Sequence, residues 1–401
     1  MLRRDRGRSA WLAAALTGSV LCGAPADAAP ASAPAAAPVA AEEAAAPSRQ
    51  QVAAAIAGEI VDDMATVERA SAVVMGHIGG TDPDALGAYV REGRLGGFIL
   101  MGSNVPKTPG ELRRITDALD GPTGTLPPLV AVDEEGGVVT RLPWDDGPAG
   151  AQLQRQDPDA SRAAFDARGR LLQDTGISVN FGIVADVGTR TSGFIRPRTL
   201  GGDAPAAAER VAAAVAGERP HAFSTLKHFP GHGAAAGDSH SAIPETAMSV
   251  EEWRADHAPP FESGIEAGAE LVMTGHLRFT AVDDAPASLS PEWYAILRDD
   301  LHFEGVAITD DLGMLLSSGE DRYADPVRNA VDAIAAGADM ALMVAESDAG
   351  TAGELADGIA AAAETGDIPP ERLEEAATRV VTLRVLASGL LDGDAFEPPR
   401  R

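Results

Sequence analysis

The stretch Ala222-Phe-Ser-Thr-Leu-Lys-His-Phe-Pro-Gly-His-Gly-Ala-Ala-Ala-Gly-Asp-Ser-His240 joins a short apolar run to a polar loop. Its first five residues are typical of a buried strand. The fourteen residues from Lys227 to His240 contain three histidines, a lysine and an aspartate. Pro230 and three glycines disfavour a helix there and permit tight bends. Because loops of this kind often bear catalytic groups, and histidine suits proton transfer, this segment is the candidate active site.

Seven further apolar runs resemble this strand, and stretches with helical spacing separate them. The eight predicted strands are 71–78, 97–101, 129–132, 178–184, 222–226, 271–274, 305–309 and 340–344. Predicted helices include 205–217, 250–267, 326–336 and a last helix at 370–391. Alternating strands and helices favour a parallel sheet, and eight repeats favour a closed one. The sequence therefore predicts an α/β fold, a single (β/α)8 TIM-like barrel that can be irregular in its first strands.

Charged or polar residues follow five of these strands. In barrels of this type the active site lies at the carboxyl ends of the strands, so these residues are expected to meet at one face. They are Asp133-Glu134-Glu135, Asp186, Lys227-His228, Gly275-His276 and Asp310-Asp311.

The N-terminal part of the chain is predicted to lie outside the barrel. In residues 1–28, arginines precede an apolar run and a small-x-small cleavage site, which is typical of an export signal. An Ala/Pro-rich spacer (29–48), the barrel (49–393) and a short tail (394–401) follow. A lipid anchor at Cys22 is disfavoured, because the preceding residue is a leucine. The sequence thus predicts a secreted or envelope protein.

Composition excludes several classes of function. The formal net charge of −28 disfavours nucleic acid as a partner, and no basic stripe is present to bind phosphates. A single cysteine leaves the chain without an internal disulfide. Beyond the predicted signal, no apolar stretch approaches the length of a transmembrane span. No cofactor is implied, and the oligomeric state does not follow from the sequence.

Two sets of residues have both a catalytic and a structural interpretation. Asp310 ends a strand, where it could act as a nucleophile or charge stabiliser or could cap a helix. With Asp311 beside it, one aspartate can cap while the other faces the cavity. Asp238 lies two residues from His240, so it can bind one ring nitrogen and fix the tautomer. The alternative for this pair is a solvated turn.

A carboxylate, two arginines and a cluster of histidines complete the candidate residues. Asp133 begins a glycine-containing segment and could accept hydrogen bonds from two neighbouring hydroxyls of a sugar. Arg141 and Arg198 could hold that carboxylate or donate to the sugar, with surface salt bridges as the alternative. The histidines could suggest a metal site, but no zinc spacing matches and prolines and glycines argue against a shared helix face. The possible ligands of such a metal are His228, His232 and His240 together with Asp238.

Together these motifs resemble glycoside hydrolase family 3, in its bacterial β-N-acetylglucosaminidase (β-N-acetylhexosaminidase) branch. The family motif Lys-His-Phe-Pro-Gly-His-Gly-x4-Asp-x-His is matched at every defined position by Lys227 to His240. The resemblance spans about residues 71–391. Supporting matches are Gly96-Gly-Phe-Ile-Leu, Asp133-x-Glu-Gly-Gly, Arg198-Thr-Leu-Gly, Val272-Met-Thr-Gly-His and Thr309-Asp-Asp-Leu-x-Met314.

The resemblance implies a retaining exo-hydrolase acting on small glycans that contain N-acetylglucosamine, from cell wall or chitin. Asp310 takes the place of the nucleophile that forms a covalent glycosyl-enzyme, and His240 that of the acid/base with Asp238 as its partner. The residues that match sugar-binding positions are Asp133, Arg141, Arg198, Lys227 and His228.

The chain departs from the family pattern at a few positions. Val138 stands where arginine is usual, Glu134 where glutamine is common, and Ala234-Ala235 where Asp-Thr often occurs. Three alternative functions remain open at this level. They are a β-N-acetylglucosaminide phosphorylase, a β-glucosidase of the same family and a non-catalytic wall-binding barrel.

Overall fold

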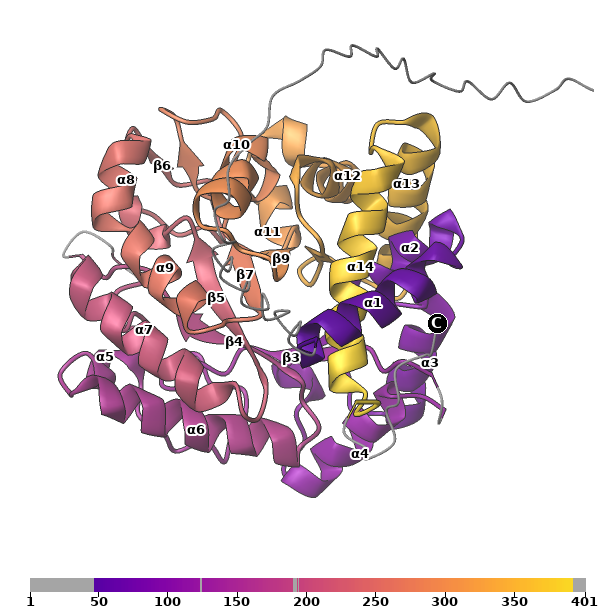
Figure 1. Cartoon of the computed structure of the whole chain (residues 1–401), viewed down its shortest axis with the longest axis horizontal. Coiled ribbons are helices and arrows are strands. Elements are labelled where there is room, and N and C mark those ends of the chain that lie inside the picture. The colour runs from indigo at the N-terminus through magenta and orange to yellow at the C-terminus, as the bar shows by residue number, and fades with distance from the viewer. Residues whose placement is uncertain (1–46, 123–124, 190–192, 194, 392–401) are drawn as a thin grey trace, which may run out of the picture. The chain divides into compact units, whose positions relative to one another are not determined.

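Eight short parallel strands form the centre of the computed structural model, which describes residues 47–122, 125–189, 193 and 195–391 (Figure 1). Neighbouring strands pair in the order β10-β1-β2-β3-β4-β5-β7-β9. An isolated bridge between Ile308 and Met340 brings β9 next to β10, so the ring is nearly closed. The strands are β1 Val74–Gly76, β2 Gly97–Leu100, β3 Leu129–Val132, β4 Val179–Val184, β5 Phe223–Phe229, β7 Leu271–Thr274, β9 Val306–Thr309 and β10 Ala341–Leu342. The predicted α/β barrel is confirmed.

Side chains of β1, β2, β3, β7, β9 and β10 alternate between two apolar clusters. In β3, Leu129 and Ala131 belong to the cluster inside the barrel, whereas Val130 and Val132 pack against the surrounding helices. Both faces of the strands are therefore buried, which explains why they appear in the sequence as continuous apolar runs.

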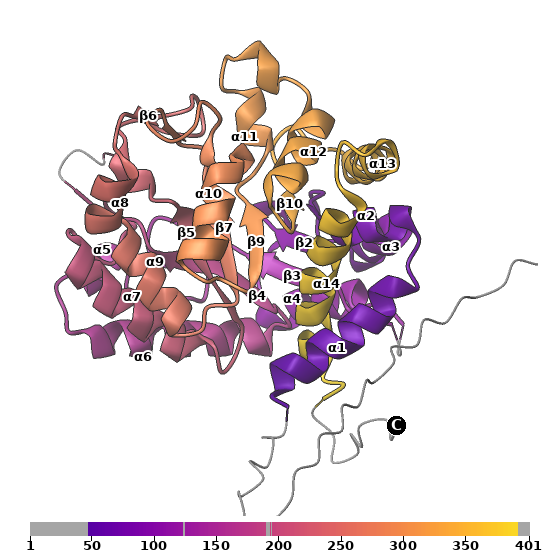
Figure 2. The same cartoon turned by 45° about the horizontal axis from the view of Figure 1, so that its top comes forward.

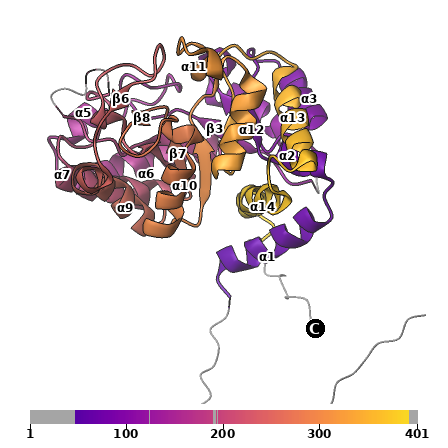
Figure 3. The same ribbon diagram turned by 90° about the horizontal axis from the view of Figure 1, so that it is seen from above.

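Helices surround the strands. Figures 1 and 2 show α6, α7 and α9 along one side and α2, α12 and α13 along the other, and Figure 3 shows α1 beside α14. α14 also contributes Val380 and Leu383 to the cluster inside the barrel. The α-helices are α1 Arg49–Asp62, α2 Thr66–Ala72, α3 Pro83–Gly93, α4 Pro109–Leu119, α5 Gly150–Leu153, α6 Pro158–Asp174, α7 Ala204–Glu218, α8 Val250–Asp256, α9 Ala258–Glu266, α10 Pro291–Ala295, α11 Gly313–Leu316, α12 Pro326–Ala336, α13 Thr351–Thr365 and α14 Pro370–Ala387.

Several predicted boundaries are wrong. The helix expected over 250–267 is broken at His257 into α8 and α9, because two prolines occupy the first turn of α9 and supply no N–H to continue α8. The first strand is shorter than predicted, since Ser71 and Ala72 belong to α2. α14 ends at Ala387, before the predicted end at 391.

A second, two-stranded parallel sheet pairs β6 Glu245–Thr246 with β8 Arg278–Phe279. The sequence analysis did not predict it, because two-residue strands have no periodicity to detect. Arg278 binds Glu245 and forms a bidentate pair with Glu320, at 2.8 and 2.9 Å. These contacts fasten the end of the loop that follows β5.

The predicted signal and Cys22 lie outside the described residues, as do most of the spacer and the C-terminal tail. In the part of the chain that is described, no helix combines the length and apolarity needed to cross a membrane.

Candidate active site

The predicted site residues lie at one end of the barrel, where the parallel strands have their carboxyl ends. A cavity of about 1270 Å³ lies at the opposite end, since its lining includes Pro128, Ser178 and Ala222, which directly precede strands. That cavity is therefore not part of the site. The residues that end or follow the strands are Asp133 (β3), Asp186 (β4), Lys227 and His228 (β5), His276 (β7) and Asp310 (β9).

Strand β5 is longer than predicted and includes Lys227 and His228, which the sequence analysis placed after its end. The Lys227–His228 and Phe229–Pro230 peptide bonds are cis. The strand tolerates these buried polar side chains because carboxylates from β3 and β4 bind them.

The Lys227 ammonium lies between two carboxylates. Its Nζ is 2.7 Å from Asp133 Oδ1 and 2.8 Å from Glu135 Oε1. Arg198 forms a bidentate pair with Glu135, at 2.7 and 2.9 Å. Arg198 was expected to hold Asp133 or to donate to the sugar; the carboxylate that it pairs with is Glu135. Burial alone would raise the pKa of Glu135, yet the two cations lower it to about 2.

Asp133 remains the carboxylate that can receive a ligand. Its side chain is 18% exposed, whereas that of Glu135 is 2% exposed. Arg141 Nη2 lies 3.5 Å from Asp133 Oδ2, which agrees with the predicted pairing. This arrangement allows Asp133 to accept hydrogen bonds from neighbouring hydroxyls while Lys227 and Arg141 hold its carboxylate in place.

His228 is oriented by a buried carboxylate. Its Nδ1 lies 2.7 Å from Asp186 Oδ2, and because a carboxylate only accepts, Nδ1–H is the donor. Nε2 lies 3.3 Å from Arg198 Nη2 and accepts from that guanidinium when the ring is neutral. Burial opposes ionisation of Asp186, but His228 and His232 lower its pKa. Asp186 thus sets the tautomer that His228 presents to a ligand.

Asp310 is an ionised carboxylate beside these groups. Its backbone N–H donates to Thr274 O (2.8 Å), and its Oδ1 accepts the Asp311 N–H (2.8 Å). Burial would raise the pKa of Asp310, but the neighbouring His228 and His276 lower it to about 2. A charged carboxylate in this position suits nucleophilic attack or stabilisation of positive charge. Asp311, and not Asp310, accepts the N–H of Gly313 that begins α11 (2.9 Å).

His240 and Asp238 form a hydrogen-bonded pair on the loop after β5. His240 Nδ1 lies 2.6 Å from Asp238 Oδ1, and the two side chains are 61% and 48% exposed. Burial alone would raise the pKa of Asp238, but the hydrogen bond with His240 lowers it. With Nδ1 held by Asp238, Nε2 is the ring nitrogen that would exchange a proton. The loop lies at the same mouth, because Ser239 binds His232, whose backbone N–H donates to Asp186 Oδ1.

Buried contacts anchor this loop between the two residues of the pair and ahead of them in the chain. His232 Nε2 lies 3.0 Å from the hydroxyl of Ser239, which stands between Asp238 and His240. Trp253 Nε1–H donates to Pro230 O (2.7 Å). The tip of the loop is therefore exposed while its base is fixed to the core.

Glu134 is buried beneath the Asp133 segment and behaves unlike its neighbours. Its Oε2 accepts the N–H groups of Arg141 and Leu142, both at 2.8 Å, whereas its buried Oε1 receives no donor. Burial and the adjacent carboxylate of Asp145 raise the pKa of Glu134 to about 7. A proton on Oε1, donated to Asp145, satisfies this otherwise unpaired atom, and Arg168 neutralises Asp145 (2.7 Å).

We expect Glu134→Gln to stabilise the protein at alkaline pH. Because the folded-state pKa is about 7 and the ordinary value is 4.5, the stability that Glu134 contributes is complete below pH 4.5 and is lost as the pH rises through 7. At about 1.4 kcal/mol per pKa unit, the loss is about 3 kcal/mol at most. The variant should melt higher than wild type at pH 8 and equally at pH 4.5, by calorimetry.

The exposed Glu92→Gln serves as the matched control and should leave the pH profile of Tm unchanged. The neighbouring buried Glu218, whose pKa burial raises to about 8, is present in all three proteins and so cancels in the comparison. Parallel Tm curves for wild type and Glu134→Gln from pH 4.5 to 8 would show that Glu134 is ionised throughout.

Three site residues were expected at the active face but were given no individual role: Glu135, Asp186 and His276. Each lies just after the end of a strand, and this position is what indicated that they face the site. Their partners lie 35 to 63 residues away in the chain, so spacing alone did not reveal the pairs. Among the described residues, no group of three or more histidine, cysteine or acidic side chains is arranged to hold a metal ion.

Known proteins match most of the chain. The model of the Glycosyl hydrolase family 3 N terminal domain matches residues 72–383. A protein named beta-hexosaminidase from Pseudomonas aeruginosa is 33% identical over 317 residues, which cover 78% of this chain and 89% of that protein. A protein of the same name from Methylobacillus flagellatus is 31% identical over 276 residues, covering 65% of this chain and 76% of that protein.

Solved structures agree with these matches. A glycoside hydrolase family 3 β-N-acetylglucosaminidase from Paenibacillus sp. str. FPU-7 superposes with a TM-score of 0.75 at 28% identity, covering 84% of this chain and 65% of the other. A β-N-acetylhexosaminidase from Beutenbergia cavernae superposes with a TM-score of 0.70 at 27% identity, covering 80% of this chain and 99% of the other.

Proposed function

Because the chain belongs to glycoside hydrolase family 3, we propose that it is a retaining exo-β-N-acetylglucosaminidase. It would release terminal N-acetylglucosamine from oligosaccharides derived from cell wall or chitin. The observation that carries this proposal is the hydrogen-bonded pair of His240 and Asp238. The pair lies on a loop at the end of the barrel where the ionised Asp310 also lies. The names of the relatives support an N-acetylhexosamine as the sugar.

In the first step of the proposed mechanism, a carboxylate oxygen of Asp310 attacks the anomeric carbon. The bond from that carbon to the leaving oxygen breaks, and protonated His240 gives its Nε2 proton to this oxygen. Asp238 stabilises the imidazolium through Nδ1. In the second step, neutral His240 takes a proton from water, whose oxygen attacks the same carbon and releases Asp310.

Sugar binding is assigned to the cluster beside Asp310. Asp133 would accept from two hydroxyls, and Lys227, Arg141, Arg198 and His228 would hold this carboxylate or bind neighbouring hydroxyls. The dense pairing of these groups before any ligand is bound reduces the cost of ordering them when the sugar enters.

We expect wild-type enzyme to cleave p-nitrophenyl N-acetyl-β-glucosaminide and to be labelled on Asp310 by an activated fluorinated N-acetylglucosamine. The fluorine slows the second step, so the covalent ester accumulates and peptide mass spectrometry locates it. The β-glucoside tests the sugar preference. No cleavage between pH 5 and 8, or a label on another residue, would contradict the proposal.

Phosphorolysis is the second candidate. A neutral histidine repels phosphate less than a second carboxylate would, and His240 occupies the acid/base position. N-acetylglucosamine 1-phosphate as the main product in phosphate buffer would indicate a phosphorylase, whereas free N-acetylglucosamine indicates hydrolysis.

We also propose that the enzyme is exported, on the basis of the signal-like sequence of residues 1–28. Recovery of protein outside the cytoplasm with a mature N-terminus at Ala29 would support export, and intact protein in the cytoplasm would contradict it.

A further inference from the structure

The seam between β9 and β10 differs from the other contacts in the barrel. All other neighbouring strands of the eight-stranded sheet pair through parallel ladders, whereas β9 and β10 share one isolated bridge. Four backbone hydrogen bonds cross here: Asp339 N and Met340 N donate to Ala307 O (2.7 and 3.2 Å), Thr309 N donates to Met340 O (3.0 Å), and Leu312 N donates to Leu342 O (2.9 Å). The strand that leads to Asp310 is therefore joined to its neighbour through a single bridge and not through a regular ladder.

Side-chain oxygens supply hydrogen bonds where the ladder is short. They act at the start, the middle and the carboxyl end of the seam, and each accepts a backbone N–H from the opposite strand or its extension. The acceptors are Asp339 Oδ2 for Ala307 (2.9 Å), Thr309 Oγ1 for Leu342 (3.0 Å), and Asp311 Oδ1 and Oδ2 for Val344 (2.8 Å) and Ala345 (2.9 Å).

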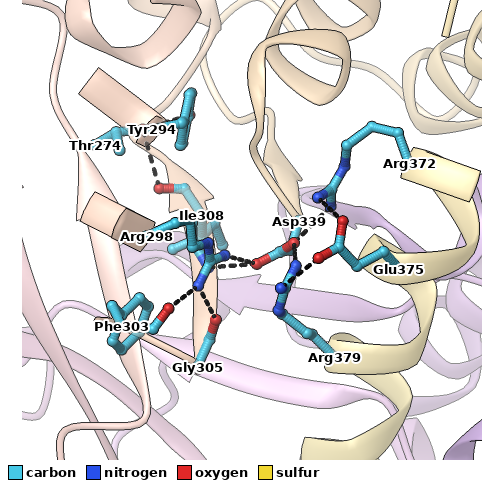
Figure 4. Close-up of polar contacts among 11 residues, drawn as sticks. Thr274, Tyr294, Arg298, Phe303, Gly305, Ile308, Asp339, Arg372, Glu375 and Arg379 are labelled. Carbon is cyan, nitrogen blue, oxygen red and sulfur yellow. Dashed lines mark hydrogen bonds and ion pairs between the residues drawn. The ribbon is translucent and has the colours of Figure 1, made fainter. Parts of the chain in front are cut away.

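At the start of the seam, a cluster of arginines surrounds Asp339, which has no exposed surface (Figure 4). Arg372 and Arg379 of α14 lie 2.6 and 3.0 Å from Asp339 Oδ1, and Arg298 binds Oδ2. This end of the seam is tied to α14 and lies away from the candidate site. Its contribution is to stability.

At the carboxyl end, Asp311 joins the seam to the candidate nucleophile. Its N–H donates to Asp310 Oδ1 (2.8 Å), and its carbonyl oxygen accepts from His276 Nε2 (2.8 Å). His276 is buried, which lowers its pKa, so a neutral ring donates from Nε2 and accepts the Ser288 hydroxyl at Nδ1 (2.7 Å). The backbone and the side chain of Asp311 are thus both fixed, and its N–H holds one oxygen of Asp310.

We propose that Asp311 is a positioning residue for the reaction: its carboxylate fastens the turn that bears Asp310 to the end of β10, and its N–H orients the Asp310 carboxylate toward the anomeric carbon. This inference rests on the proposed role of Asp310 as nucleophile. It predicts that losing the hydrogen bonds from Val344 and Ala345 to the Asp311 carboxylate misplaces the nucleophile. Sugar binding should not change, because the residues around Asp133 lie after other strands.

The test is Asp311→Asn. The amide keeps the shape of the carboxylate but turns an NH₂ group toward one of the backbone donors, so at least one hydrogen bond to Val344 or Ala345 is lost. We expect kcat/KM to fall about 30- to 100-fold, since a displacement of about 1 Å costs about that much. The factor should be equal for 2,4-dinitrophenyl and p-nitrophenyl substrates, and the Kd for N-acetylglucosamine should change less than about threefold.

Asp339→Asn, at the other end of the same seam, is the matched control. It leaves three arginines with less compensating charge, so Tm should fall by about 5 °C or more while kcat/KM per folded molecule at 25 °C stays at the wild-type value. If Asp311→Asn does not fold, Ser288→Ala releases His276 and should lower kcat/KM about fivefold, again equally for both substrates.

Three results would overturn the positioning role. They are wild-type kcat/KM in Asp311→Asn, a loss confined to the poorer leaving group, or an equal loss in Asp339→Asn. Labelling by the fluorinated sugar separates this failure from failure of the proposed function. Wild type and Asp311→Asn labelled on Asp310 at the same rate would refute only the positioning role, whereas wild type labelled elsewhere would refute both.

Discussion

Asp310→Ala should lower kcat/KM for p-nitrophenyl N-acetyl-β-glucosaminide by about 10⁴-fold or more, because no other group can form the covalent intermediate. In the structure, Asp310 has a pKa near 2 and is held by the Asp311 N–H, so an oriented anion is lost. Fold and sugar binding should be preserved, since Lys227 binds Asp133 and Glu135, and Arg198 binds Glu135, without Asp310. Steady-state kinetics and Tm measure the two effects.

Azide provides a second readout for the same variant. A small anion can occupy the space that the Asp310 carboxylate leaves and attack the anomeric carbon from that face. With an activated substrate, Asp310→Ala should form the α-glycosyl azide in a single inversion. The exposed Asp174→Ala at the end of α6 should retain wild-type kinetics. Activity of Asp310→Ala above about one per cent of wild type would exclude Asp310 as the nucleophile.

Much of the barrel was predictable because its strands are buried on both faces. β3 and β7 occupy the predicted residues, and β9 begins one residue late. Each is an apolar run followed by a polar residue at the mouth. The predicted end of a strand was wrong where contacts with distant residues outweighed the local pattern of apolar and polar residues. β5 continues through Lys227 and His228 because Asp133 and Asp186, which follow β3 and β4, bind them.

The candidate site was predictable in its residues but not in its pairs. Chain order placed Asp133, Lys227 and Asp310 at strand ends, and the structure brings these ends to one face. Arg198 was expected to hold Asp133 or to donate to the sugar, and the structure pairs it with Glu135, 63 residues away, because sequence does not reveal which of the carboxylates between Asp133 and Glu135 faces the arginine. The catalytic roles of these residues are predictions that the variants must decide.

His240→Ala should affect substrates according to how much their leaving groups need a proton. For poor leaving groups, kcat/KM should fall about 10²- to 10⁴-fold, the usual contribution of a general acid. For 2,4-dinitrophenyl N-acetyl-β-glucosaminide, whose phenolate leaves without protonation, kcat/KM should fall less than about tenfold. Asp238→Asn keeps the loop sequence but removes the charge that stabilises the imidazolium, so it should show the same leaving-group dependence to a smaller degree.

The stereochemistry of azide rescue distinguishes His240 from Asp310. In His240→Ala, Asp310 still forms the covalent intermediate, and azide replaces the water that His240 can no longer activate. The second inversion then yields the β-glycosyl azide, opposite to the product from Asp310→Ala. An α-azide from His240→Ala, or an equal loss of kcat/KM for all leaving groups, would assign His240 to a step other than proton transfer at the leaving oxygen. The acid/base would then have to be sought among the other groups at the barrel mouth.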